Sequence, residues 1–319
     1  MAVWAIPPFV QFSNFVALAF IAYEAAVEYA GFDVFSGNQS PTDYTTQYKI
    51  AFIGNGFQYY NDMPRVLEAL SDGNIIQDSV FRYQGSLYSI ANKGNGMDEV
   101  YDQDNVANED GTYDYGADTV ASLFDEASWD YVVMNDRALF PIVEKKMYYS
   151  VQAIYDTYLP YLNATNVRTV PVFIATYAPA DEERRMPDGA NIVSVENFTQ
   201  SMHLGYYSYA QLMKPYLTKR QKPRVAPVGK AFLNVYNNDA DTWLKLFDQD
   251  DLYNPSAYGT YLQALCVYKT IYAKLPPAEL ALPTYPEFLF YTSRLVNDNP
   301  EYPTYDEASY LYSVANNIC

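Results

Sequence analysis

The chain is short of histidine, cysteine and basic residues, and each shortage argues against a class of function. Its 319 residues include one His, two Cys and 20 Lys and Arg against 38 Asp and Glu, which gives a net charge of −18. A chain this acidic repels a phosphate backbone, so we expect no nucleic-acid partner. Cys266 and Cys319 are too few for a framework of disulfides, and no Cys/His cluster is present to hold zinc. We therefore expect no metal and no other cofactor.

Aromatic side chains, in contrast, are abundant. Apolar residues make up 50 % of the chain and aromatic residues 17 %, with 34 tyrosines. This composition predicts a globular chain with a large core and with phenol groups left for the surface. Interfaces between subunits are enriched in Tyr and depleted in Lys, and this composition has the same bias.

The N-terminal segment has no charged residue from Met1 to Tyr23. Residues 9–30 follow Pro7-Pro8 and are predicted to form a helix, which a linker up to residue 45 joins to the rest of the chain. Three interpretations stay open: a helix packed on its own domain or on another subunit, a membrane-inserted anchor, and an uncleaved signal. The absence of a basic n-region argues against a signal, and Glu24 and Glu28 argue against a clean membrane span.

The body of the chain alternates short apolar runs with helical patterns. The predicted strands cover residues 48–53, 75–81, 129–134, 169–176 and 224–227, and the predicted helices cover residues 64–71, 117–126, 145–162, 195–216 and 256–274. Alternation of this kind predicts an α/β domain over residues 46–275, a flavodoxin-like three-layer α/β/α sandwich around a central parallel sheet. Residues 276–319 are predicted to form a Pro- and Tyr-rich extension with a short helix at 305–314.

Four segments carry polar and glycine residues at the ends of predicted strands or at the start of a predicted helix. They are Gly54-Asn55-Gly56-Phe57 with Tyr60-Asn61-Asp62-Met63-Pro64, then Gly85-Ser86-Leu87, then Trp129–Asp136, and last Asp251-Leu252-Tyr253-Asn254-Pro255-Ser256. In this order and these strand contexts the segments resemble the SGNH (GDSL-type) esterase family, over about residues 48–274. The resemblance implies the α/β/α fold and a former oxyanion hole made by Gly56, Gly85 and Asn135.

The departures from the family pattern matter more than the matches. Gly56 stands at the nucleophile position without a hydroxyl, and Asn254 stands at the base position with an amide that accepts no proton near neutral pH. Asp251 keeps the position of the orienting acid. His203 lies on a predicted helix outside the last segment, where we expect a partly exposed side chain with no role in the relay. The resemblance thus predicts a pseudoenzyme with no catalytic residues.

The retained glycines also have a purely structural interpretation. Gly54 and Gly56 suit a tight turn that needs unusual backbone angles, while Asn55 and Asp251 are suited to hydrogen-bonding the loops around it.

Three hypotheses for function remain. The first is a structural or assembly subunit of a larger complex, which contacts other protein subunits, or a membrane, through residues 9–30. The second is a carbohydrate-binding pseudoenzyme, and the third is an esterase with altered catalytic residues. Two N-glycosylation sequons, at Asn163 and Asn197, together with the acidity, favour the extracellular space or an organelle lumen.

Overall fold

The computed structural model describes residues 46–97, 116–164, 167–185, 194–282 and 301–319. All of these residues belong to one compact unit, Ser40–Cys319. The helix expected at residues 9–30 lies outside the described residues, as does the stretch 283–300 of the expected C-terminal extension. Within the described ranges, none of the helices combines the length and the apolar character needed to cross a membrane.

The described residues form a five-stranded parallel sheet at the centre of the unit. The strands β1 (Tyr48–Gly54), β2 (Ile75–Phe81), β3 (Tyr131–Met134), β4 (Val170–Ile174) and β5 (Arg224–Ala226) lie in the order β2-β1-β3-β4-β5. β3 and β4 are buried along their whole length, which is typical of strands covered on both faces. The strand order reverses between β1 and β3, and the crevice at that reversal is where open α/β sheets bind ligands.

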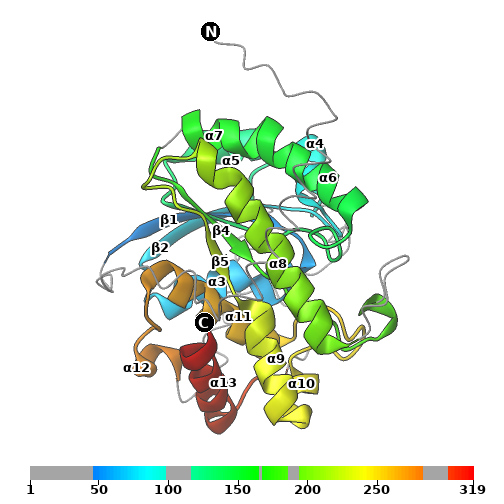
Figure 1. Ribbon diagram of the computed structural model, residues 1–319. Coiled ribbons are helices and arrows are strands. Elements are labelled where there is room, and N and C mark those ends of the chain that lie inside the picture. Colours follow the sequence, from blue (N-terminus) through cyan, green and yellow to red (C-terminus); the bar gives the residue numbers. More distant parts are fainter. Residues whose placement is uncertain (1–45, 98–115, 165–166, 186–193, 283–300) are drawn as a thin grey trace. The chain divides into compact units, whose positions relative to one another are not determined.

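Helices cover both faces of the sheet (Figure 1). One layer contains α4 (Leu87–Lys93), α5 (Val120–Glu126), α6 (Glu144–Ala153), α7 (Leu159–Ala164) and α8 (Val195–Met213), and the other contains α3 (Met63–Leu70) and α11 (Ala257–Tyr272). α9 (Val228–Asn238) contacts a helix from each layer, α8 and α11, and α10 (Ala240–Lys245) follows it. This arrangement confirms the predicted three-layer α/β/α sandwich.

Several predicted elements differ from the observed ones in detail. The run predicted as one helix over 145–162 is α6 and α7 joined by a π-helical turn, Ile154–Tyr158. The seven-residue helix α4 was not predicted. Its capping box has Ser at both positions, Ser86 and Ser89, whereas the usual sequence signature has Glu or Gln at the second position. Helices α9 and α10 were not predicted either, although α9 is amphipathic, with Val228, Phe232 and Val235 buried.

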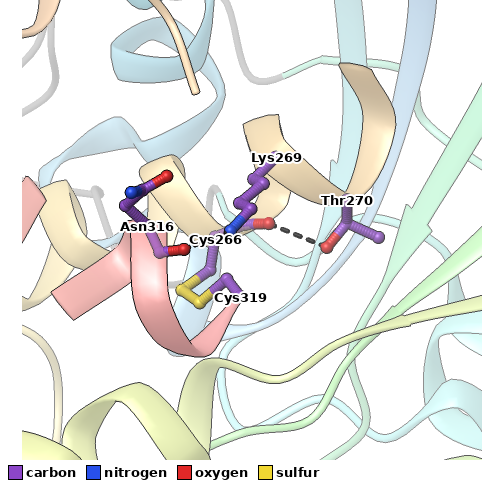
Figure 2. The surroundings of a disulfide bond; sticks show 5 residues. All are labelled: Cys266, Lys269, Thr270, Asn316 and Cys319. Carbon is purple, nitrogen blue, oxygen red and sulfur yellow. Dashed lines mark hydrogen bonds between the residues drawn. A yellow bond between two sulfur atoms is a disulfide. The ribbon is translucent and has the colours of Figure 1, made fainter. Parts of the chain in front are cut away.

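The C-terminal helix α13 (Tyr305–Ile318) is longer than the predicted 305–314. It packs against α11 and α9, and a disulfide joins Cys319, which follows it directly, to Cys266 of α11 with a Cα–Cα distance of 5.2 Å (Figure 2). From the sequence, the two cysteines were expected to be too few for a framework of disulfides, and their pairing was not predicted. The single crosslink spans 53 residues of sequence and fixes α13 to the sandwich.

Tyrosines contribute both to the core and to the surface of the described residues. The largest fully buried side chains include Tyr158, Tyr177, Tyr206, Tyr209, Tyr258, Tyr261, Tyr268 and Tyr272. Many of these rings pack on other aromatic rings; Tyr177, for example, stacks on Phe232 at 4.0 Å between centroids. Others, such as Tyr83, Tyr149, Tyr216 and Tyr305, are exposed, as the composition predicted.

Candidate functional site

The first site segment forms the turn that follows β1. Asn55 is the N-cap of the short helix α2 (Gly56–Tyr59), and its side-chain oxygen accepts a hydrogen bond from the Phe57 N–H at 3.2 Å. Asn is among the preferred residues at an N-cap because this bond satisfies a free N–H of the first helical turn. The turn therefore places Gly56 at the first position of α2, at the carboxyl edge of the sheet.

The backbone explanation for the two glycines of this turn is wrong. Neither Gly54 nor Gly56 has a positive φ; the described glycines that do are Gly73, Gly94 and Gly116. Close neighbours explain both glycines instead. A Cβ atom on Gly54 would lie 2.0 Å from Oδ1 of Asn135, and one on Gly56 would lie 2.5 Å from Oδ1 of Asn254.

The last site segment reaches the same place from the start of α11. Oδ1 of Asp251 accepts hydrogen bonds from the backbone N–H groups of Tyr253 and Asn254, at 2.8 and 2.9 Å. Its other oxygen accepts from Nδ2 of Asn254 at 2.6 Å. Asp251, Asn254 and Gly56 therefore lie in the spatial order acid, base, nucleophile that the family resemblance implies.

This arrangement keeps the geometry of a relay without its reactive groups. The Asn254 side chain donates one N–H to Asp251 and turns its carbonyl oxygen toward Gly56. A neutral carboxamide has no basic nitrogen with which to take a proton, and glycine has no hydroxyl to lose one. The three positions cannot perform the proton transfer that activates a seryl nucleophile.

The residues expected to form the former oxyanion hole meet at Asn55. Nδ2 of Asn55 donates to the Gly85 carbonyl at 2.7 Å, and Oδ1 of Asn55 accepts from Nδ2 of Asn135 at 2.8 Å. The Asn135 amide group also donates to the Asp136 carbonyl at 3.0 Å, and the Gly85 N–H donates to the Arg82 carbonyl at 2.9 Å. Both donors are thus already engaged by the protein, and an oxyanion beside Gly56 would have to compete with these bonds.

The first and last segments also pack directly on one another. Asn61, at a φ of 52°, donates from its side chain to the Pro255 carbonyl at 2.8 Å and to the Thr260 hydroxyl at 3.1 Å. Nε2 of Gln263, in α11, donates to the Phe57 carbonyl. These bonds give the motif residues a structural role, because they join α2 to the start of α11.

A buried carboxyl group supports the site from behind. Asp136 directly follows Asn135, is fully buried, and accepts from the Leu87 and Arg137 N–H groups at 3.0 and 2.8 Å and from the Tyr209 hydroxyl at 2.8 Å. Burial raises the pKa of Asp136 from 3.8 to about 6, although these hydrogen bonds oppose the rise. The residue ties the end of β3 to the start of α4.

Aromatic and cationic side chains surround the pair formed by Gly56 and Asn254. The Tyr253 ring lies 5.1 Å from the Phe57 ring, and the Arg184 guanidinium lies 4.7 Å from the Tyr253 ring centroid. Tyr83 is 51 % exposed and lies within electrostatic reach of Tyr253, as does Arg137.

Tyr60 belongs to the same group of side chains. Burial raises the pKa of Tyr60 to about 12, and the acids Asp251 and Asp248 add to the rise while Arg184 opposes it. The phenol therefore stays protonated at physiological pH and is available as a hydrogen-bond donor.

The other residues singled out in the sequence lie away from this place. His203 is in α8, half-buried, and burial followed by the nearby Lys230 lowers its pKa to about 4. Asn163 is exposed in α7 and Asn197 is exposed in the first turn of α8. Within the described ranges, no three His, Cys, Asp or Glu side chains gather as a metal site would need.

Two contributors to the site were not singled out in the sequence. Gln58, in α2, donates to Oδ1 of Asn135 at 2.6 Å and to the Ile53 carbonyl at 3.1 Å. It lies four residues after Gly54, the last residue of β1. Asp136 was quoted only as part of the third segment. A polar residue immediately after an apolar run is the signal available for Asp136, because the run predicts a strand and the residue then lies at its carboxyl edge.

Comparisons with known proteins show a likeness of fold. No protein-family model and no curated protein matches the sequence. A DUF4886 family protein from Bacteroides uniformis is 17 % identical, with a TM-score of 0.53 over 85 % of this chain and 94 % of that one. A protein described as a GDSL-like lipase from Parabacteroides merdae is 11 % identical, with a TM-score of 0.42 over 72 % of this chain and 97 % of that one.

A gut microbial diltiazem-metabolizing enzyme is 12 % identical, with a TM-score of 0.44 over 73 % of this chain and 49 % of that one. Among these three structures, the Bacteroides uniformis protein alone has a TM-score above 0.5. At 17 % identity the likeness shows that the two proteins share a fold, and it carries no statement about activity.

Proposed function

We propose that this chain is a catalytically inactive SGNH-hydrolase-like protein that serves as a structural or assembly subunit of a larger complex. The observation that carries the inactivity is the contact between Gly56 and Asn254: the amide oxygen of Asn254 lies 2.5 Å from the point where a nucleophile's side chain would begin. Asp251 holds that amide in place at 2.6 Å. Loss of the nucleophile or the base alone costs a serine hydrolase on the order of a millionfold in turnover.

An esterase assay with a rebuilt relay tests the inactivity. We expect no turnover of short-chain acyl esters or acetylated sugars by the native chain above background. Gly56→Ser combined with Asn254→His restores a hydroxyl and an imidazole beside Asp251, and any activity gained should disappear when Asp251→Ala is added. Native turnover of about 1 s⁻¹ or more, within the ordinary enzyme range, that is lost on Asp251→Ala would instead support the third hypothesis, an esterase with altered catalytic residues.

The assembly role is supported by the apolar segment at residues 9–30. Its sequence has apolar residues on two faces of the predicted helix, so a single protein surface could cover only about half of it. The uncovered face requires a protein subunit or a lipid, because a stripe of that size associates in water. Sedimentation of the full chain, with and without residues 1–35, tests this role.

We also propose that the protein resides in the extracellular space or an organelle lumen, either free or held at a membrane by residues 9–30. The Cys266–Cys319 disulfide supports this location because such bonds persist mainly in oxidising compartments. The exposed sequon residues Asn163 and Asn197 agree with it. Mass spectrometry of the protein from its native source, before and after enzymatic removal of N-glycans, would show whether either asparagine carries a glycan.

A second candidate function is carbohydrate binding at the former esterase site. The observation in its favour is the set of tyrosines around Gly56 and Asn254, namely Tyr60, Tyr83 and Tyr253, because aromatic faces suit sugar rings. Calorimetry with neutral and acetylated oligosaccharides tests it. Tyr83→Ala should weaken binding, while Tyr149→Ala, at an exposed tyrosine on α6, serves as the matched control.

A further inference from the structure

The loop that carries Asp251 and Asn254 is closed at its base by hydrogen bonds between its two ends. The Ser256 hydroxyl donates to the Lys245 carbonyl, and the Ser256 N–H donates to the Leu246 carbonyl at 3.0 Å. One step further in, the Asp248 N–H donates to the Asn254 carbonyl at 2.8 Å. We call residues 245–248 and 254–258 the neck of the relay loop.

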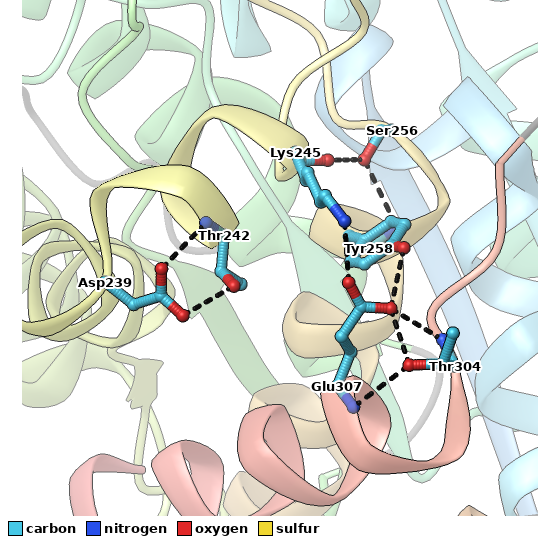
Figure 3. A network of polar contacts seen from close by, with 7 residues as sticks. All are labelled: Asp239, Thr242, Lys245, Ser256, Tyr258, Thr304 and Glu307. Atoms are coloured by element: carbon cyan, nitrogen blue, oxygen red, sulfur yellow. Dashed lines mark hydrogen bonds and ion pairs between the residues drawn. The ribbon is translucent and has the colours of Figure 1, made fainter.

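One carboxylate from the C-terminal helix spans this neck (Figure 3). Oε1 of Glu307 pairs with Nζ of Lys245 at 2.7 Å, on the outgoing side of the neck. Oε2 of Glu307 accepts from the Tyr258 hydroxyl at 2.9 Å, on the returning side. Glu307 therefore bonds to both sides of the loop that holds Asn254 beside Gly56, although it comes from a helix about fifty residues further along the chain.

The disulfide fixes the other end of the same helix. Tyr258 meets Glu307 near the start of α11 and α13, and Cys266 meets Cys319 further along both helices, so the two helices run in the same direction. Beside the disulfide, Nζ of Lys269 donates to the Asn316 carbonyl (Figure 2). α13 is thus attached at both ends, and its apolar face is buried between the two attachments.

We propose that Glu307 is a positioning residue that clamps the neck of the relay loop, and that the Cys266–Cys319 disulfide holds Glu307 in place to do so. The carboxylate is suited to this role because it stays ionised: although partial burial raises the pKa of Glu307, hydrogen bonds from Lys245, Thr304 and Tyr258 bring it down to about 2. Hydrogen bonds to an ionised group are about twice as strong as neutral ones.

Reduction of the disulfide would release one of the two attachments. A thiolate of an added dithiol attacks Sγ of Cys319, which is more exposed than the fully buried Cys266. The S–S bond breaks, Cys266 leaves as a thiolate and takes a proton, and the second thiol of the reagent then displaces Cys319. Both cysteines end as thiols and the reagent ends as a disulfide, so the electrons and protons balance.

Hydrogen exchange measured by mass spectrometry on the full chain tests the proposal. In Glu307→Gln we expect amides of residues 246–256 to exchange about tenfold faster, because a hydrogen bond to a charged group is worth a factor of this order. Tyr258→Phe and Lys245→Met each remove one arm of the clamp and should give smaller increases. The control is Tyr312→Phe, which removes a different polar attachment of α13, the hydrogen bond from the Tyr312 hydroxyl to the Pro276 carbonyl at 2.8 Å, and leaves the carboxylate of Glu307 with its partners.

The outcomes separate a clamp from general loosening of the helix. Faster exchange at 246–256 in Glu307→Gln and in the dithiol-treated protein, with Tyr312→Phe unchanged there, supports the proposal. Unchanged exchange at 246–256 in Glu307→Gln, or an equal increase in Tyr312→Phe, overturns the role of the carboxylate. An effect of reduction confined to residues 315–319 overturns the role of the disulfide. Tyr258→Phe loses only a hydroxyl and keeps the test valid if Glu307→Gln fails to fold. None of these results depends on whether the protein is an enzyme.

Discussion

Oδ1 of Asn254 lies 2.5 Å from the point where a side chain on Gly56 would begin, so the present position of the Asn254 amide leaves no room for a side chain on Gly56. Glycine at position 56 is thus explained by contact and not by backbone conformation. The same contact joins the turn after β1 to the loop before α11, and the energetic coupling between Gly56 and Asn254 is measurable.

The first prediction concerns that coupling. Gly56→Ala should lower the free energy of unfolding by about 1–3 kcal/mol, the usual cost of overpacking a close contact. In an Asn254→Ala background the same change should cost less than about 0.5 kcal/mol, because the obstructing oxygen is gone. Denaturant melts of the four proteins give the double-mutant cycle. A coupling energy near zero would show that the Asn254 side chain moves aside freely.

The second prediction concerns the buried acid behind the site. The pKa of Asp136 is raised from 3.8 to about 6, so the folded state holds this proton more tightly than the unfolded state does. Its contribution to stability is therefore largest below about pH 4 and is lost as pH rises toward 6, by about 3 kcal/mol in total. Asp136→Asn should remove this part of the pH dependence. Thermal melts from pH 4 to 7 on both proteins provide the measurement, and identical pH profiles would contradict the prediction.

The third prediction concerns Glu307, whose contribution to stability should change with pH in the opposite direction to that of Asp136. The pKa of Glu307 is lowered from 4.5 to about 2, so its contribution to stability is present above pH 4.5 and is lost as pH falls toward 2. Because the Glu307 side chain is 23 % exposed and its partner Lys245 is 40 % exposed, solvent screens the pair and the effect should be smaller than that of Asp136. Thermal melts of the native chain and of Glu307→Gln between pH 5 and pH 2 measure this contribution as the difference between their two stability-against-pH curves. A constant difference between the two curves from pH 5 down to 2 would count against the lowered pKa.

The fourth prediction concerns the disulfide. Closing a loop of 53 residues stabilises a chain by up to about 4 kcal/mol through the entropy of the unfolded state. The double variant Cys266→Ser/Cys319→Ser should therefore melt at a lower temperature than the oxidised protein, and at a temperature close to that of the dithiol-treated native protein. If the reduced native protein melts at the same temperature as the oxidised protein, α13 is held by its packing and polar contacts alone.

The fifth prediction separates the N-terminal segment from the domain. The described residues by themselves form a five-stranded sheet with a buried apolar core, so we expect deletion of residues 1–35 to leave the melting temperature of the domain nearly unchanged while abolishing assembly or membrane retention. Sedimentation and melting of both proteins, side by side, provide the test. Two monodisperse monomers in detergent-free buffer, with the shorter one unfolding early, would assign the segment to the core of the domain.

The sheet was predictable from sequence because its strands are short apolar runs that end in polar or glycine residues. β2 was predicted with its observed bounds, Ile75–Phe81, and the motif order predicted that Gly56 and Asn254 would lie on one rim. The contacts that explain the glycines were not predictable, since the approach of Asn254 to Gly56 joins positions far apart in the chain. The pairing of Cys266 with Cys319 and the span of Glu307 across the neck are long-range in the same way.

The contact between Gly56 and Asn254 also constrains the order in which substitutions are tolerated. A serine introduced first at position 56 meets the amide oxygen of Asn254, whereas a change at position 254 meets no side chain at position 56. A mutational path toward hydrolase chemistry is therefore open from the base side and obstructed from the nucleophile side. The order in which the two positions are changed should therefore decide how much stability each single step costs.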